Sequence, residues 1–252
     1  MAWLAGVMGA EGRMIDDPNT VCPRIAVLMD ENTSSGATRY EAHKGYFKGL
    51  LDAGGAPYGV PYAPQLVADV VERFDGLMAV GGRFAYPAEW YVDGVPAPSP
   101  PSPRFDVERS LMSAFLSARK PVLGVCAGMQ MLACLNGGRL AGDLGAWRPT
   151  ALAHDGPGLH TIHLTEGTLL RRLVGVDDLE VNTFHREAVA DPGDVVRIGA
   201  VAEDGIIEAI ELPGEAFALG VQWHQELFAD AAHAGNAIFA GFVAACAGTR
   251  HG

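Results

Sequence analysis

Short apolar runs alternate with stretches of helical spacing along the first half of the chain. Apolar runs bounded by glycine, proline or aspartate are typical of buried strands, and apolar residues every three or four positions are typical of helices that cover a sheet. The runs predict strands at residues 24–29, 58–61, 75–80 and 121–125, and the spacing predicts helices at residues 36–51, 64–74 and 105–120. This order of elements predicts a parallel, doubly wound α/β sheet with right-handed crossovers.

The second half of the chain has a different pattern. Its apolar runs predict strands at residues 159–164, 179–181, 195–201, 206–212 and 217–222. The connections are too short for crossover helices, except at residues 167–174, so we expect antiparallel strands beside the parallel core. A closing helix is predicted at residues 226–247, interrupted near Gly235. We find no internal repeat, and we expect an N-terminal extension over residues 1–22 followed by a single domain over residues 23–252.

Composition and charge narrow the class of protein. With 252 residues, 49% hydrophobic and 19% charged, the chain has the composition of a globular protein. Its net charge of −12 argues against a nucleic-acid partner. The four cysteines lack the paired spacing of a zinc site or a disulfide framework, which fits a reducing compartment. The apolar residues 1–10 lack a preceding basic segment and are too short to span a membrane, so we expect a cytoplasmic protein without a membrane partner.

Prolines crowd residues 86–103, after the predicted strand at 75–80. A segment so rich in proline cannot form a helix or an inner strand. A surface linker is one interpretation. A loop that shapes the substrate site is the other, because α/β proteins bind ligands at the edge where their parallel strands end.

The run at 121–125 ends in the pattern Gly124-Val125-Cys126-Ala127-Gly128. A strand that turns into a helix at Gly-x-Cys-x-Gly places the cysteine on a sharp bend, as Gly-x-Ser-x-Gly does for serine nucleophiles. A helix N-terminus and a nearby imidazole lower the pKa of a thiol from about 8.5 to 7 or below. A cysteine in an apolar run is more often a small core residue, which is how we interpret Cys134. The flanking glycines favour a nucleophile at Cys126.

The C-terminal part of the chain supplies a base. His224 follows an apolar run and stands two positions before Glu226, so the histidine would take the thiol proton and the glutamate would support the imidazolium. Acyl transfer also needs donors for an oxyanion, and the backbone amides of Ala127 and Gly82 are the candidates. Taken singly, His224 reads as a structural histidine, Glu226 as a surface charge at a helix start and Gly82 as part of a turn.

Other histidines invite a metal interpretation. His160 and His163 lie in His-Thr-Ile-His, with His154 shortly before them. Residues three apart on a strand face opposite sides, and no cysteine or acidic pair stands nearby in ligand spacing. The sequence therefore predicts no metal site.

The whole set resembles the class I (triad) glutamine amidotransferase-like superfamily, and within it the gamma-glutamyl-gamma-aminobutyrate hydrolase family of cysteine hydrolases. The resemblance extends from about Arg24 to Phe242. It is carried by residues 79–82, 121–130, 181–185 and 217–226.

The resemblance implies a flavodoxin-like α/β fold with Cys126 as nucleophile, His224 as base and Glu226 as its partner. It implies no cofactor, and it allows a homodimer. Residues implied to contact the substrate are Gly81, Gln130, Asn182, Thr183 and His185. The chain departs from the family at Gln225, where proline is usual, and at 83–85, where Arg-Phe-Ala replaces an expected acidic contact.

Three functions follow as hypotheses from this resemblance. The first is a hydrolase of small-amine gamma-glutamyl amides, the amine being gamma-aminobutyrate or a polyamine derivative. It would form a glutamyl-thioester and serve polyamine catabolism. The second is a glutaminase subunit that passes ammonia to a synthetase partner. The third is a binding protein that has kept the fold and lost turnover, against which the complete Cys/His/Glu set argues.

Overall fold

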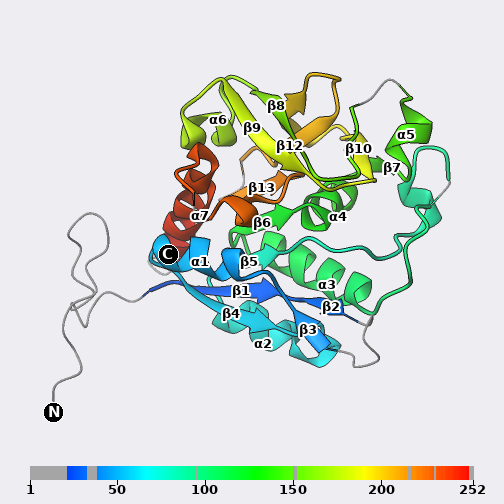
Figure 1. Cartoon of the computed structure of the whole chain (residues 1–252). Helices are drawn as coiled ribbons and strands as arrows, with labels where there is room; N and C mark the ends of the chain where they lie inside the picture. The colour runs from blue at the N-terminus through cyan, green and yellow to red at the C-terminus, as the bar shows by residue number, and fades with distance from the viewer. Residues whose placement is uncertain are drawn as a thin grey trace, which may run out of the picture.

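The computed structural model describes residues 22–249 except 33–38, 95, 150–151, 215–216 and 230. A nine-stranded sheet runs through its centre in the order β4-β1-β5-β6-β13-β12-β11-β8-β9 (Figure 1). The first five strands in this order are parallel, and each later strand is antiparallel to its neighbour. The strands are β1 (Arg24–Leu28), β4 (Ala56–Val60), β5 (Gly76–Ala79), β6 (Val122–Val125), β8 (Gly158–Leu164), β9 (Asp178–Thr183), β11 (Arg197–Ala202), β12 (Ile207–Glu211) and β13 (Ala218–Val221).

Helices cover both faces of the parallel part of the sheet. Alternate side chains of β1 enter two separate hydrophobic clusters, with Ile25 in one and Ala26 in the other, because side chains along a strand point to opposite faces. Leu50 and Phe242 join the first cluster, whereas Leu111 joins the second. The helices of the first face are α1 (Lys44–Asp52), α6 (Leu169–Val174) and α7 (Ala237–Gly248), and those of the second are α2 (Val67–Arg73), α3 (Arg104–Ser117) and α4 (Ala127–Leu135). This is the predicted doubly wound, flavodoxin-like fold with antiparallel strands added in the second half.

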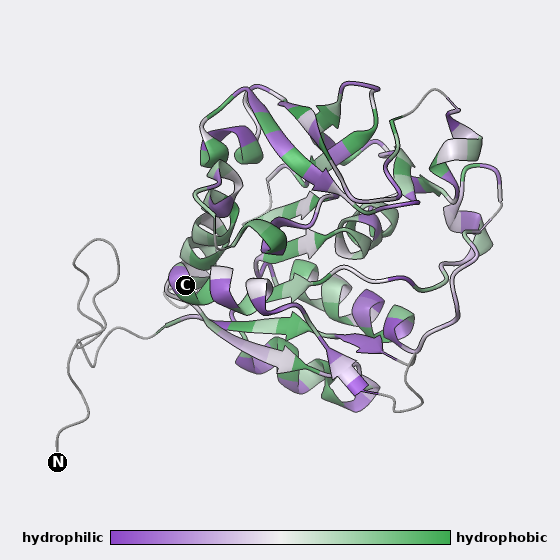
Figure 2. Ribbon diagram, in the orientation of Figure 1, coloured by the Kyte–Doolittle hydropathy of each residue, from purple (hydrophilic) through white to green (hydrophobic). Residues whose placement is uncertain are grey.

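Hydropathy follows this layering. The strands at the centre of the sheet are mainly hydrophobic, and hydrophilic residues gather on the small hairpin of β2 (Asp30–Asn32) and β3 (Arg39–Glu41) (Figure 2). The described helices include none that is long and apolar enough to cross a membrane.

The predicted helix at 36–51 is too long at its N-terminal end. Residues 36–38 lie outside the described residues, residues 39–41 form β3, and α1 begins only at Lys44. The side chain of His43 caps α1 by accepting a hydrogen bond from the amide of Gly45. Tyr40, which fitted the helical spacing, instead packs its ring edge-on against Tyr62, with 4.8 Å between the ring centroids.

The closing helix is also shorter than predicted. Two 3-10 turns, Gln225–Phe228 and Ala234–Asn236, precede α7. Side-chain hydrogen bonds stabilise the segment between these turns and the helix, because Asn236 donates to the carbonyls of Phe228 and Ala231 and accepts from Gln225. The sequence pattern did not predict β2, β7 (Arg139–Ala141), β10 (Ala188–Asp191), α5 (Leu144–Trp147) or the 3-10 turn Ala88–Trp90, and the first turn of the helix predicted at 64–74 is a 3-10 turn, Pro64–Leu66.

The predicted extension over residues 1–22 lies outside the described residues, apart from Cys22, which is exposed and free. The parallel strands matter most for the site, since β1, β5, β6 and β13 lie next to one another in the sheet. Their carboxyl ends therefore meet at one edge.

Candidate active site

Cys126 occupies a strained turn between β6 and α4. Its backbone has φ +52° and ψ −105°, in a region that non-glycine residues rarely adopt. Both flanking glycines are required by close packing. A Cβ on Gly124 would come within 2.4 Å of the carbonyl oxygen of Gly128, and one on Gly128 within 2.5 Å of that of Ala79. The predicted elbow is therefore present.

His224 lies directly across from this elbow. Strand β13 pairs in parallel with β6, and the amide of Cys126 donates to the carbonyl of Val221 at 2.8 Å. His224 follows three residues after Val221, and its imidazole lies beside the thiol of Cys126. The Nδ1 atom of His224 is 2.7 Å from a carboxylate oxygen of Glu226, which leaves Nε2 as the ring nitrogen available to the thiol.

The surroundings of His224 favour its protonated form. Burial opposes the charge, but hydrogen bonds and charge interactions with Cys126 and Glu226 outweigh it and raise the pKa of His224 to about 10. The imidazole is thus placed to hold a proton between a thiol and a carboxylate, as a nucleophilic triad requires.

A cavity of about 780 Å³ opens at this edge of the sheet. Its lining contains the thiol, the imidazole and the carboxylate together with residues from both halves of the chain. Six predicted site residues besides Cys126 lie in the lining, namely Gly81, Gly82, Gln130, His185, His224 and Glu226.

Two buried side chains that the sequence analysis missed hold the Gly81-Gly82 turn. The hydroxyl of Tyr46 accepts from the amide of Gly81 at 3.1 Å. The guanidinium of Arg104, fully buried, donates to the carbonyl of Gly81 at 2.9 Å and also to that of Val80. These hydrogen bonds hold the turn in place, and both Gly81 and Gly82 lie in the cavity lining.

Asn182 and Thr183, predicted to contact substrate, do not lie in the cavity lining. The side chain of Asn182 accepts from the amide of His224 at 2.9 Å and donates to its carbonyl at 2.8 Å. Thr183 donates to the carbonyl of His154. These two residues position neighbouring backbone, and both are buried. Ala127 is likewise buried outside the lining.

The proline-rich segment 86–103 forms part of the cavity wall. Ala97, Pro98, Ser99 and Pro100 are in the lining. The amide of Ala85 donates to the carbonyl of Pro100 at 2.9 Å, so the segment returns to the turn that follows β5. The structure thus favours the interpretation as a substrate-shaping loop over that of a surface linker.

Comparisons with known proteins place the chain in a family. The Peptidase C26 family model matches residues 23–226. The chain belongs to the Peptidase C26 family. Within it, the chain is 36% identical over 192 residues to Rv2859c of Mycobacterium tuberculosis, a protein provisionally named a glutamine amidotransferase, covering 72% of this chain and 61% of that protein. The chain is also 29% identical to gamma-glutamyl-gamma-aminobutyrate hydrolase of Escherichia coli O157:H7, over 89% of this chain and 93% of that one.

Among solved structures, the glutaminase domain of CTPS from Trypanosoma brucei superposes with a TM-score of 0.63 at 15% identity, covering 90% of this chain and 94% of that one. At this identity the likeness concerns the fold alone. The family and the named hydrolases together support a cysteine-type amidohydrolase or amidotransferase-like activity.

Proposed function

We propose that this protein is a cysteine-dependent hydrolase of gamma-glutamyl amides of small amines. The observation that carries the proposal is the strained elbow at Cys126, which faces His224 and Glu226 at the wall of a cavity of about 780 Å³. A strained nucleophile, a base and an orienting carboxylate are the parts that acyl transfer needs.

The reaction proceeds in two steps. Cys126 Sγ, as thiolate, attacks the gamma-carbonyl carbon, and the amides of Gly82 and Ala127 stabilise the oxyanion. The C–N bond then breaks as the His224 imidazolium gives its proton to the leaving amine. Water, activated by the neutral His224, attacks the thioester, releasing glutamate and restoring the thiol.

The charges that line the cavity suit a gamma-glutamyl head group. This group carries an α-ammonium and an α-carboxylate. The lining contains two arginines, Arg83 and Arg186, that could pair with the carboxylate, and carboxylates of β2 and β3 that could pair with the ammonium. Arg83 begins the Arg-Phe-Ala stretch that replaces the acidic contact of the family pattern, and it pairs with Asp155 at 2.9 Å. Both signs of charge are therefore available, and the identity of the amine is left to experiment.

The test measures glutamate released from gamma-glutamyl-gamma-aminobutyrate, a gamma-glutamyl-polyamine and glutamine. Cys126→Ala is expected to lower the rate by about 10³-fold or more, since removing a nucleophile disables the whole triad. Cys134→Ala is the matched control, because Cys134 is a buried cysteine on the same helix outside the cavity.

Glutamate release that survives Cys126→Ala would contradict the assigned nucleophile. A folded wild type that releases no glutamate from any of the three substrates would contradict the hydrolase and favour a glutaminase subunit or a binding protein.

A further inference from the structure

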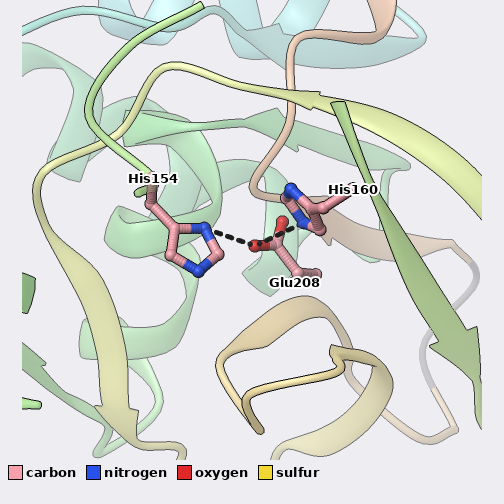
Figure 3. Close-up of side chains that lie close together, drawn as sticks. All are labelled: His154, His160 and Glu208. Atoms are coloured by element: carbon pink, nitrogen blue, oxygen red, sulfur yellow. Dashed lines mark ion pairs between the residues drawn. The ribbon is translucent and has the colours of Figure 1, made fainter. Parts of the chain in front are cut away.

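Behind the cavity wall, three imidazoles surround one buried carboxylate. Glu208, on β12, is fully buried. Its Oε1 atom lies 3.5 Å from Nδ1 of His154, 3.4 Å from Nε2 of His160 and 3.3 Å from Nε2 of His185 (Figure 3 shows the first two). His154 comes from the segment before β8, and His160 from β8 itself.

These contacts are close but are not hydrogen bonds. Among the described residues, neither carboxylate oxygen of Glu208 has a hydrogen-bond partner, and the same is true of both ring nitrogens of His160 and of Nε2 of His185. A buried polar atom without a partner costs about 1–3 kcal/mol. A ligand bound between Glu208 and His160 would give a partner to the carboxylate and to one of these ring nitrogens.

The outer hydrogen bonds show which ring nitrogens carry lone pairs. His154 Nε2 is 2.9 Å from a carboxylate oxygen of Asp204, so in the neutral ring this nitrogen holds the hydrogen and Nδ1 has the lone pair. That Nδ1 atom lies 3.5 Å from Glu208 Oε1 and 3.4 Å from the hydroxyl of Thr183. Likewise His185 Nδ1 lies 3.0 Å from the carbonyl of Glu187, so its Nε2 faces Glu208 with a lone pair. Lone pairs directed at a carboxylate repel it unless a positive charge lies between them.

We propose that His154 Nδ1, His160 Nε2 and the carboxylate of Glu208 bind a divalent transition-metal ion of the zinc type. The three ligand atoms lie within 4.8 Å of one another. Two of the three separations, 3.4 and 3.5 Å from Glu208 Oε1, are close to the ligand-to-ligand edge of about 3.3 Å that a tetrahedron with Zn–N bonds near 2.0 Å requires, and the separation of the two imidazole nitrogens stays within 4.8 Å.

The chemistry around the ligands agrees with a metal. The Asp204–His154 hydrogen bond is the carboxylate–histidine arrangement that orients metal-binding imidazoles. The two carboxylates of the cluster, Glu208 with its side chain 0% exposed and Asp204 beside His154, together carry the two negative charges that one divalent ion would balance.

The proposed ion would connect the segment around His154 with strands β8 and β12 beside the catalytic cavity. His185 contacts the same carboxylate and lines that cavity. The backbone of His185 also donates to the carbonyl of His154 at 2.9 Å. The ion would therefore stabilise the cavity wall at His185 without taking part in acyl transfer.

No metal site is predicted here from the sequence, because the proposed ligands lie far apart along the chain. His163 does face the other side of β8, where it is exposed and pairs with Asp178. The acidic partner of His160 comes from β12, 48 positions along the chain, so no local spacing indicates it.

The experiment uses the full chain without a histidine tag. Metal content is measured by mass spectrometry after dialysis, and the chelator-treated protein is titrated with Zn²⁺ and with Co²⁺, whose visible absorption reports the coordination geometry. We expect about one ion per chain and a tetrahedral Co²⁺ spectrum without a thiolate band, because the ligands are nitrogen and oxygen.

His160→Ala and Glu208→Gln are expected to weaken binding by more than about 100-fold, since losing an outer partner alone costs 10- to 100-fold. His163→Ala, on the opposite face of the same strand, is the control and should bind as the wild type does. Glu208→Gln keeps the side-chain shape, so it remains informative if His160→Ala fails to fold.

Wild-type protein that contains no metal and takes up neither ion after chelation would overturn the proposal, leaving protons to balance the cluster. Equal weakening by His163→Ala and His160→Ala would also overturn it, since the ion would then be bound at the surface. Neither readout depends on turnover, so these outcomes are independent of the proposed hydrolase activity.

Discussion

Cys126 holds a backbone conformation that costs about 1–3 kcal/mol in an unconstrained chain. The strain persists because the residues on both sides cannot relax. Gly124 packs against the backbone of Gly128, and Gly128 against the carbonyl of Ala79. The same constraint points the thiol toward His224, so strain and reactivity have a common cause at this residue.

The pair of His224 and Glu226 predicts a specific pH profile. The imidazolium donates a proton to the leaving amine, so kcat/KM should fall as the pH rises through the raised pKa of His224, about 10. Glu226→Gln removes the carboxylate charge 2.7 Å from Nδ1 and should therefore lower this pKa. We expect the basic limb to move to lower pH and kcat to fall by about 10²-fold or more.

The measurement is kcat/KM from pH 6 to 11 for both proteins. Glu203→Gln, at an exposed turn, serves as the control. An unchanged basic limb in Glu226→Gln would assign that limb to a group other than His224.

At the scale of elements, the turn after β5 depends on a buried ion pair from α3. Arg104 and Glu108 are both fully buried and 2.7 Å apart, and Arg104 also holds the carbonyls of Val80 and Gly81. The pair thus joins the start of α3 to the turn that carries the proposed oxyanion donor. Arg104 acts there as a positioning residue.

Arg104→Met should destabilise the protein by about 3–5 kcal/mol, because it leaves Glu108 buried without its cation. Combining it with Glu108→Leu should restore much of the stability, since the fully buried carboxylate is then gone and the other partner of Arg104, Asp30, is 35% exposed and can be solvated. Both the single and the double variant should have a low kcat, because the carbonyls of Val80 and Gly81 no longer accept a hydrogen bond from Arg104. Urea unfolding and steady-state kinetics check both effects, and full recovery of kcat in the double variant would show that Arg104 acts only on stability.

At the scale of the whole molecule, the segment 86–103 connects the two halves of the chain beside the cavity. Tyr91 forms a bridge with Leu140 of β7, and its hydroxyl donates to a carboxylate oxygen of Glu187 at 2.8 Å. Ser99 Oγ lies 3.5 Å from the other carboxylate oxygen. Glu187 and Ser99 both line the cavity, so these contacts set the shape of its wall.

Tyr91→Phe should lower the free energy of unfolding by about 1–3 kcal/mol, because it leaves a buried carboxylate oxygen without its donor. The loosened wall should raise KM while kcat is largely retained, since the triad is untouched. Tyr58→Phe, on an exposed tyrosine of β4, is the control. A Tyr91→Phe enzyme with unchanged KM would mean that the segment does not shape the substrate site.

The local pattern of apolar residues was sufficient to predict the elements in which apolar residues recur at regular spacing. The parallel strands and the helices between them follow from apolar runs and helical spacing, since each element buries its own face. The pattern failed where a side chain from elsewhere decides the local structure. Residues 39–41 form a strand because they pair with β2, and Asn236 and Gln225 delay the start of α7 through side-chain hydrogen bonds.

The sequence by itself determined the elbow at Cys126 and the His224–Glu226 pair, because both depend on residues that are neighbours along the chain. Only the tertiary structure decided the other parts. Arg104 reaches the turn at Gly81 across 23 positions, and Glu208 reaches His160 across 48. The fold creates such contacts by burying side chains from distant strands and helices next to one another, where an unsatisfied charge is costly. The spacing of residues along the chain does not indicate that proximity.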